Sequence, residues 1–323
     1  MMTTLAPSAD VLKALNLKGR SFLTVADITG PEIQSLIQLA VALKQEKRDR
    51  KPHPYLAGQQ VAMYFQQPST RTRVSFEVGI ADLGAHPLML RQDEIGLGKR
   101  EAVADIARTL GRMVDGIMIR HLHHADVEEL AQYAGVPVIN GLTKDHHPCQ
   151  ILADLMTVYE QFGSLAGHKL TFVGDGSNNM ARSLMEGCAL VGMPVTIAAP
   201  ASHQPDAATV ERCRALASGT AVEVTDDLQA AVAGAHVVYT DVWASMGDEA
   251  EAEQRRQIFK AYQVNEPLMA KAASNAIVLH CLPAHRGEEI THDTLERFAT
   301  VIFDEAENRL HAQKALMAAL LTR

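Results

Sequence analysis

A short segment, "PSTRT", follows the apolar run "VAMYF" and offers more hydrogen-bond donors than an ordinary turn needs. Ser69, Thr70, Arg71 and Thr72 stand where a helix should begin, so hydroxyls, a guanidinium, backbone N–H groups and the helix dipole converge on one point. The other interpretation is an ordinary helix cap, with Arg71 and Arg73 solvated. The whole cluster favours a phosphate ligand. Because the G-x-x-x-x-G-K-[ST] motif is missing, a small phosphorylated molecule is favoured over ATP.

Two further segments carry side chains that suit an anion or a carbonyl oxygen. Arg120 ends the apolar run "GIMI", where a charge usually has an anionic target, although a salt bridge with Asp115 explains it equally well. His147 and Gln150, in "HHPCQ", share one face of a first helical turn that Pro148 would begin. They could donate to a carbonyl oxygen or carry a proton, but an isolated histidine is more often structural.

The second half of the chain has three comparable positions. In "GDGSNN" the third glycine of a dinucleotide motif is missing, and an asparagine such as Asn179 either caps a helix or presents its amide to a carboxylate. Asp241 ends "VVYTD" and could bind an amine, or could belong to a capped turn around Trp243. Cys281 follows "AIVLH" and matters only if it is exposed, since most cysteines with apolar neighbours are inert.

These residues have to be positioned by strands and helices that alternate along most of the chain, a pattern typical of parallel βαβ units. Strands are expected at residues 59–65, 86–90, 115–120, 136–140, 169–175, 194–200, 235–241 and 276–283. Helices are expected between them, with a bridging helix at 147–163 and a closing amphipathic helix at 305–321. The sequence therefore predicts an α/β protein with two doubly wound parallel-sheet domains, whose ligands bind at the carboxyl ends of the strands.

Composition narrows the class of protein. The 323 residues are 47% hydrophobic, 21% charged and only 5% aromatic, with a formal net charge of -8, so neither nucleic acid nor a membrane is an expected partner. No apolar run reaches the length of a signal peptide core or a membrane span. Four scattered cysteines without a C-x-x-C pair indicate free thiols, a cytoplasmic protein and no zinc site.

Taken in order, "STRTR", "HPCQ", "DVWASMG" and "HCLPAHRGEE" resemble the carbamoyltransferase family from about Phe22 to the C-terminal helix. The first two motifs are shared across that family, whereas "SMG" and "HCLP" single out its ornithine branch. The resemblance implies a carbamoyl phosphate domain at residues 1–147, completed by the helix 305–323, and an ornithine domain at 148–304. It implies no cofactor and no metal.

Carried over position by position, the resemblance assigns two sets of binding residues. The carbamoyl phosphate site would comprise Ser69, Thr70, Arg71, Thr72, Arg120, His147, Gln150, Cys281, Leu282 and Arg309. The ornithine site would comprise Asn179, Asp241, Ser245 and Met246. The catalytic residues among them would be Arg71, Arg120, His147, Cys281 and Arg309.

The implied reaction is attack of the δ-amine of L-ornithine on carbamoyl phosphate, which gives L-citrulline and phosphate. A carbamoyltransferase for aspartate, putrescine or an N-acylated ornithine is the nearest alternative. An NAD-dependent dehydrogenase and a non-catalytic anion-binding regulator are alternatives of other classes.

The resemblance also suggests a trimer, or an assembly of trimers. Many family members have a glutamine in the sequence "QLG", which they supply to a neighbouring subunit's site. Gly96 stands at that place here, with Gln92 nearby, so this contact stays open.

Overall fold

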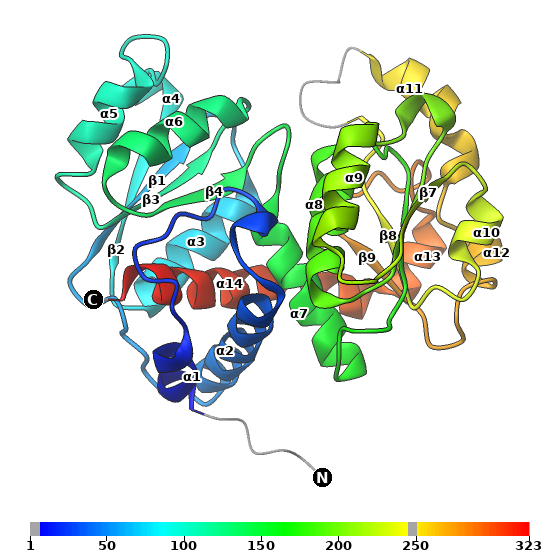
Figure 1. Cartoon of the computed structure of the whole chain (residues 1–323), viewed down its shortest axis with the longest axis horizontal. Coiled ribbons are helices and arrows are strands. Elements are labelled where there is room, and N and C mark those ends of the chain that lie inside the picture. The colour runs from blue at the N-terminus through cyan, green and yellow to red at the C-terminus, as the bar shows by residue number, and fades with distance from the viewer. Residues whose placement is uncertain (1–6, 245–250, 323) are drawn as a thin grey trace. The chain divides into compact units, whose positions relative to one another are not determined.

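The computed structural model describes residues 7–244 and 251–322. The chain forms two compact units (Figure 1). The first comprises the chain up to Met156 together with the segment from Glu307 onward, and the second is Thr157–Ala306. The division falls within two long helices, α7 (Pro148–Phe162) and α14 (Ala299–Leu321).

The first unit contains a four-stranded parallel sheet with the order β2-β1-β3-β4. The strands are β1 (Gln60–Phe65), β2 (His86–Arg91), β3 (Gly116–Arg120) and β4 (Val138–Leu142). The apolar side chains of β1, β3 and β4 are buried, as expected for parallel strands covered on both faces. The edge strand β2 is the most exposed of the four.

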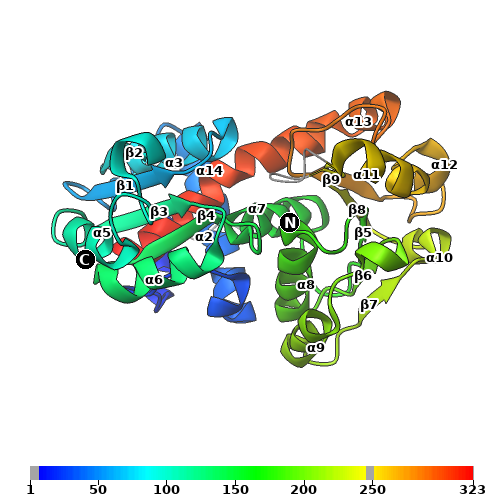
Figure 2. The same ribbon diagram turned by 90° about the horizontal axis from the view of Figure 1, so that it is seen from above.

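Helices cover both faces of this sheet (Figures 1 and 2). On one face, α5 (Val103–Leu110) and α6 (His124–Ala134) share a buried cluster with β1 and β3. On the other lie α2 (Gly30–Arg48), α3 (Thr70–Asp82) and the second part of α14. Two short helices, α1 (Ser8–Ala14) and α4 (Gln92–Ile95), and the 3-10 turn η1 (Val25–Asp27) complete the unit.

The second unit has a five-stranded parallel sheet with the order β7-β6-β5-β8-β9. The strands are β5 (Leu170–Val173), β6 (Val195–Ala198), β7 (Val222–Thr225), β8 (Val237–Thr240) and β9 (Ile277–His280). Its helices are α8 (Asn179–Val191), α9 (Ala207–Leu216), α10 (Leu228–Val232), α11 (Ala252–Phe259), α12 (Glu266–Met269) and α13 (His292–Arg297), with 3-10 turns η2 (Ala201–His203) and η4 (Lys260–Tyr262).

The predicted α/β class with two parallel sheets is confirmed, and all eight expected strands are present. Two details of the prediction were wrong. Strand β7 was missed because it is a short edge strand of four residues with only one buried side chain, so its pattern is weak. Helix α14 begins at Ala299, six residues before the expected start at 305, because "ATVIFD" continues the helix without a breaker. In the described parts of the chain, no helix combines the length and apolarity needed to cross a membrane.

Helix α14 carries several polar side chains into the interior of the first unit. His311 is buried, its Nε2 lies 3.2 Å from the Glu307 carboxylate, and burial together with Lys314 and Lys44 lowers its pKa to about 3. A histidine whose pKa is lower in the folded state binds fewer protons than it does in the unfolded chain. Stability should therefore be lost as the pH falls from about 6.5 towards 3.

We expect His311→Gln to reduce this acid sensitivity. Between pH 6.5 and 4.5 the wild type should lose about 2 kcal/mol more unfolding free energy than the variant, because over this range His311 takes up a proton in the unfolded chain but not in the folded protein. Urea unfolding at both pH values measures the difference. His86→Gln changes an exposed histidine of β2 and is the control. Equal losses in the wild type and His311→Gln would contradict the assignment.

Candidate functional site

Helix α3 begins at the carboxyl end of β1 and brings hydroxyl and guanidinium groups together. Ser69 is the N-cap residue, and its Oγ accepts a hydrogen bond of 3.3 Å from the Thr72 N–H. The capping interpretation of Ser69 is thus correct, although its own O–H is still able to donate. Thr72 is fully buried, and its Oγ1 accepts hydrogen bonds from Arg120 Nη1 at 3.3 Å and from Arg309 Nη2 at 2.8 Å. The Thr72 hydroxyl therefore bonds to arginines from both β3 and α14.

A bulge in β4 sets the position of Arg120. Ile119 pairs with Asn140 but Arg120 pairs with Leu142, so Gly141 is an extra residue in the register. A Cβ atom at Gly141 would lie 2.7 Å from Met118 Sδ. A larger residue at this position would therefore displace the Met118 side chain. Arg120 Nη1 donates to the Thr72 hydroxyl, and Asp115, the salt-bridge partner considered from the sequence, accepts from the Gln60 N–H.

His147 lies just before the first turn of α7, close to the same arginines. It is buried, and its pKa lies well below the ordinary value because of burial and the positive charges of Arg309, Arg120 and Arg71, in that order. The imidazole is therefore neutral at neutral pH. Three guanidiniums acting on one buried histidine mark a concentration of positive charge at the carboxyl ends of the strands, which suits a small anion.

Gln150 and Thr70 differ in their surroundings. Gln150 is fully buried in α7 and its Nε2 donates to Asp154 Oδ1 at 2.8 Å. Thr70 is exposed at the first position of α3.

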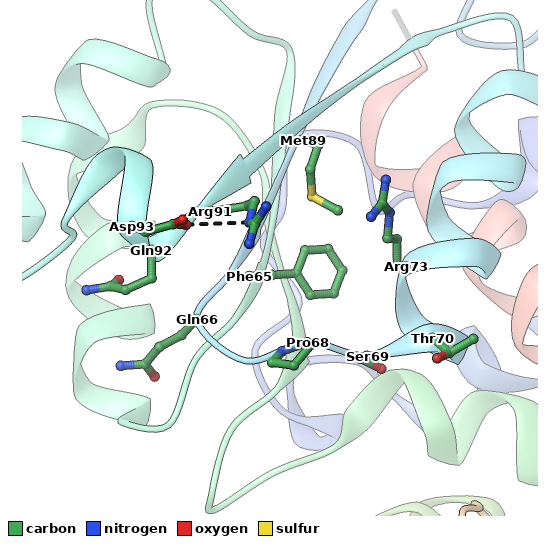
Figure 3. Close-up of a pocket in the computed structure, with 10 residues that line it drawn as sticks. All are labelled: Phe65, Gln66, Pro68, Ser69, Thr70, Arg73, Met89, Arg91, Gln92 and Asp93. Carbon is green, nitrogen blue, oxygen red and sulfur yellow. Dashed lines mark ion pairs between the residues drawn. The ribbon is translucent and has the colours of Figure 1, made fainter.

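A pocket of about 600 Å³ opens beside the start of α3 (Figure 3). The arginine cluster, by which we mean Arg71, Arg120 and Arg309, does not line it. The pocket shares Ser69 and Thr70 with the predicted site, and Arg73 projects towards it. Arg71 does not line it, since side chains two residues apart lie on opposite sides of a helix. The remaining lining residues are Phe65, Gln66, Pro68, Met89, Arg91, Gln92 and Asp93.

The segment around Gly96 has a local structural explanation. Gly96 is the C-cap residue of α4 in the left-handed conformation, with φ of 68°, and a Cβ there would lie 2.7 Å from the Arg100 Cβ. Gln92 accepts a hydrogen bond from the Tyr64 hydroxyl, and its Nε2 lies 3.5 Å from the Leu97 carbonyl oxygen. The amide of Gln92 is thus engaged within its own unit.

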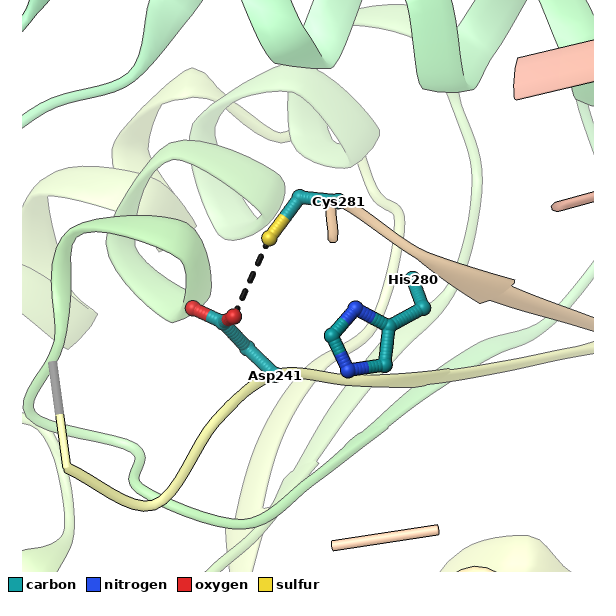
Figure 4. Close-up of side chains that lie close together, drawn as sticks. All are labelled: Asp241, His280 and Cys281. Atoms are coloured by element: carbon teal, nitrogen blue, oxygen red, sulfur yellow. Dashed lines mark hydrogen bonds between the residues drawn. The ribbon is translucent and has the colours of Figure 1, made fainter. Parts of the chain in front are cut away.

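In the second unit, Asp241 and Cys281 meet at the carboxyl ends of β8 and β9 (Figure 4). The Cys281 thiol donates to Asp241 Oδ1 at 3.0 Å, and the Val242 N–H donates to the same oxygen at 2.8 Å. Burial raises the pKa of Asp241 above its ordinary value. Cys281 is partly exposed, whereas the other three cysteines are buried. It therefore has the exposure that a reactive thiol requires. A carboxylate beside a thiol in a partly open position suits an amine ligand.

Two asparagines begin α8 near this carboxylate. Asn178 is the N-cap residue, its Oδ1 accepts from the Ala181 N–H, and its Nδ2 lies 3.5 Å from Asp241 Oδ2. Asn179, the predicted ligand, is the first helical residue and is half-buried. The other two predicted ornithine ligands, Ser245 and Met246, lie outside the described residues.

Asp241, His280 and Cys281 each bring a potential metal ligand atom within 4.8 Å of the others. A metal would need a free lone pair on the imidazole. His280 uses Nδ1 to accept from the Leu282 N–H at 2.9 Å, and its Nε2 lies 3.0 Å from Glu289 Oε1. The group therefore fits a metal poorly as it stands.

Arg255 of α11 joins the segments around Asp241, a role that no pattern in the sequence indicates. It is buried, it donates to the Trp243 carbonyl oxygen, and it forms an ion pair with Asp175 in the loop after β5. Its guanidinium also lies over the Phe259 ring, 5.4 Å from the centroid. Asp175 and Arg255 are 80 residues apart, and spacing along the chain cannot reveal such a pair.

We expect Arg255→Met to destabilise the protein by about 3–5 kcal/mol, because it leaves the buried Asp175 carboxylate without its counter-ion. Denaturant unfolding measures this. Arg256→Met is the matched control, since the neighbouring Arg256 pairs with Glu253 and Glu288 at the surface, and its loss should leave stability unchanged. A similar effect of both substitutions would contradict the importance of the buried pair.

Comparisons with known proteins cover nearly the whole chain. The family model described as "Aspartate/ornithine carbamoyltransferase, carbamoyl-P binding domain" matches residues 20–160, and the model of the "Asp/Orn binding domain" of the same family matches residues 166–320. An ornithine carbamoyltransferase of Anoxybacillus flavithermus is 52% identical over 309 residues, which cover 95% of this chain and 98% of the relative. One of Pyrococcus abyssi is 50% identical over 309 residues, 95% of this chain and 97% of the relative.

Solved structures show the same likeness. The ornithine carbamoyltransferase of Pyrococcus furiosus matches with a TM-score of 0.92 and 48% identity, covering 95% of this chain and 98% of that one. The anabolic ornithine carbamoyltransferase of Campylobacter jejuni matches with a TM-score of 0.87 and 38% identity, covering 92% and 97%.

Proposed function

The chain belongs to the aspartate/ornithine carbamoyltransferase family, and from that premise we propose that it transfers the carbamoyl group of carbamoyl phosphate to the δ-amine of L-ornithine. The amine nitrogen forms a bond to the carbonyl carbon. The bond from that carbon to the phosphate oxygen then breaks, phosphate leaves with the electron pair, and the nitrogen loses one proton. The products are L-citrulline and phosphate.

The observation that carries the proposal is the buried Thr72 hydroxyl, which accepts hydrogen bonds from both Arg120 and Arg309. The positive charges of these two arginines and of Arg71 also lower the pKa of the buried His147. Carbamoyl phosphate is small and doubly charged, and a cluster of guanidiniums at the start of α3 matches it in charge. The backbone N–H groups that follow Ser69 would add donors for the phosphate oxygens. We therefore assign carbamoyl phosphate to residues 1–147 with the helix 305–323, and ornithine to residues 148–304. The family models at 20–160 and 166–320 support this assignment.

Thr72, Arg120 and His147 are the groups we assign to the carbonyl oxygen. Negative charge develops on that oxygen when the amine attacks, and fixed donors stabilise it without reorganisation. Because the pKa of His147 is lowered, the imidazole is neutral at pH 7. It therefore acts on the carbonyl oxygen as a hydrogen-bond donor and not as an acid that transfers its proton. Arg71 and Arg309 then neutralise the departing phosphate. Gln150 supports the amide end of the carbamoyl group.

Asp241 and Cys281 are the groups we assign to the amine. A free alkylammonium has a pKa of roughly 10, so attack requires that the bound ornithine lose a proton. Removing the amine from water favours its neutral form. The Asp241 carboxylate would first attract the ornithine ammonium group. The Cys281 thiol holds this carboxylate in place through the 3.0 Å hydrogen bond to Oδ1. Asn179, Ser245 and Met246 complete the proposed ornithine site, and Leu282 borders the carbamoyl group.

We further propose a cytoplasmic enzyme of arginine metabolism that assembles as a trimer or a multiple of trimers. This rests on the family membership and on the free cysteines. Light scattering of the purified protein measures the assembly.

The test of the activity is a colorimetric citrulline assay with carbamoyl phosphate and L-ornithine. We expect turnover with ornithine and none with aspartate, putrescine or N-acetylornithine. Turnover with one of these amines but not with ornithine would show that the substrate assignment is wrong. Phosphate binding without any turnover would instead support a non-catalytic anion-binding protein.

A further inference from the structure

His280 and Glu289 form a buried pair directly behind Cys281. His280 ends β9, and Glu289 lies at the far end of the turn that follows. Both side chains are completely buried, and His280 Nε2 lies 3.0 Å from Glu289 Oε1. In Figure 4 the imidazole lies beside the Asp241 side chain, and the Cys281 thiol contacts the carboxylate of the same residue. Neither His280 nor Glu289 was singled out from the sequence.

The hydrogen bonds fix the tautomer of His280. A backbone N–H can only donate, so the Leu282 N–H at 2.9 Å requires a lone pair on Nδ1. The proton of a neutral imidazole then sits on Nε2, where the Glu289 carboxylate accepts it. Glu289 thus selects the tautomer whose other nitrogen holds Leu282. A protonated imidazole would lose this acceptor.

The hydrogen bond from the Leu282 N–H to His280 Nδ1 stabilises a backbone conformation that is unfavourable for leucine. Leu282 has φ of 57°, a left-handed conformation that leucine rarely adopts. Glu289 Oε1 also accepts from the His285 N–H at 2.6 Å, so the same carboxylate oxygen ties down the turn farther along. At the other end, the His280 N–H donates to the buried Glu305 at 2.9 Å. The residues on either side of Cys281 are therefore fixed by polar groups from three segments.

We propose that His280 and Glu289 are positioning residues that hold the turn at Cys281 and Leu282 and so keep the thiol against Asp241. Neither touches a reacting atom. Glu289 orients His280, His280 fixes the Leu282 N–H, and Cys281 lies between these anchors. The catalytic part of this inference rests on the proposed carbamoyl transfer. The geometric part concerns only the thiol and is testable without any substrate.

Two amide substitutions separate positioning from simple packing. An asparagine amide oxygen takes the place of Nδ1, so His280→Asn retains an acceptor for the Leu282 N–H but loses Glu289. A glutamine amide reaches the place of Nε2, so His280→Gln retains the contact with Glu289 but loses the acceptor. Asparagine is the smaller side chain and leaves the larger cavity. Packing alone therefore predicts that His280→Asn is the more damaging change.

The positioning role predicts the reverse order for the two variants: His280→Gln should affect Cys281 labelling and kcat more than His280→Asn does. Iodoacetamide labelling of Cys281, followed by mass spectrometry without substrates, should be several-fold faster in His280→Gln than in the wild type, because the thiol leaves Asp241. In His280→Asn the rate should stay closer to the wild type. With both substrates saturating, kcat should fall about 100-fold in His280→Gln and much less in His280→Asn. The KM for carbamoyl phosphate should change less than kcat does, because the arginines assigned to the phosphate lie on other segments.

Glu289→Gln and His53→Gln complete the design. Glu289→Gln replaces the carboxylate by an amide that can donate as well as accept, so it no longer fixes the proton of His280 on Nε2. It should therefore resemble a milder His280→Gln, with faster labelling and a lower kcat, which keeps the test available if a His280 variant does not fold. His53 is a buried histidine 3.4 Å from Glu46 in the first unit, so His53→Gln is the matched control and should leave labelling and kcat unchanged.

The inference is overturned if folded His280→Gln or Glu289→Gln lowers the melting temperature but leaves the labelling rate and kcat as in the wild type. A labelling effect in a protein that makes no citrulline would preserve the inference and refute only the proposed reaction.

Discussion

Arg71→Ala should reduce kcat/KM for citrulline formation by about 100- to 1,000-fold, the loss typical of removing one fixed donor to a developing charge. Arg71 belongs to the group of guanidiniums that act on His147, and it stands two residues after the N-cap of α3. We expect the KM for carbamoyl phosphate to rise as well, because the phosphate is charged before and after transfer. Steady-state kinetics with each substrate varied in turn measure both effects.

Arg73→Ala is the matched control for this prediction. Arg73 lies on the same helix, but it is exposed, pairs with Glu77 at 3.2 Å and faces the neighbouring pocket. Its loss should leave kcat/KM near the wild-type value. If Arg73→Ala were the damaging change and Arg71→Ala were harmless, the phosphate would belong to the pocket of Figure 3 and not to the arginine cluster.

Much of the fold follows from local patterns in the sequence. Runs such as "VAMYF" and "LTFV" are continuous and apolar because parallel strands are buried on both faces, and each is followed by a polar turn and a helical period. The positions of Arg71, Arg120 and Asp241 at strand ends are predictable for the same reason. The carboxyl ends of parallel strands lie at one edge of a sheet, so residues distant in sequence come together there.

The supporting contacts are not predictable in this way, because they join segments through packing. The bulge at Gly141, the pair of Arg255 with Asp175 and the pair of His280 with Glu289 each depend on register or on side chains from different elements. His146 shows the same limit. Nothing in the segment "HHPCQ" indicates that it is buried, yet it is, with its ring centroid 4.7 Å from that of His124. A single sequence gives the period of an element but not what packs against it.

Asp241→Asn is expected to weaken ornithine binding and, at the same time, to stabilise the protein. Burial raises the pKa of Asp241, so the folded state holds its proton more readily than the unfolded chain does. Above the ordinary pKa, ionising this carboxylate therefore costs stability, and the cost grows as the pH rises. An uncharged amide removes that cost. Its oxygen can still accept from the Val242 N–H and the Cys281 thiol, which both bond to Oδ1.

The effect on the substrate has the opposite sign. Without a carboxylate the site loses its charged partner for the amine, and the KM for ornithine should rise about 10- to 100-fold. The KM for carbamoyl phosphate should stay unchanged. Unfolding at pH 7 and pH 4 should show that Asp241→Asn is the more stable form at pH 7 and that its advantage shrinks in acid.

Asp226→Asn, at an exposed position after β7, is the control and should alter neither property. A less stable Asp241→Asn protein with normal ornithine kinetics would mean that Asp241 serves the fold alone. The amine would then have to be bound elsewhere. A gain in stability together with a loss of ornithine affinity is the combination expected of a buried charge that is kept for its ligand, because only the bound cation compensates for its burial.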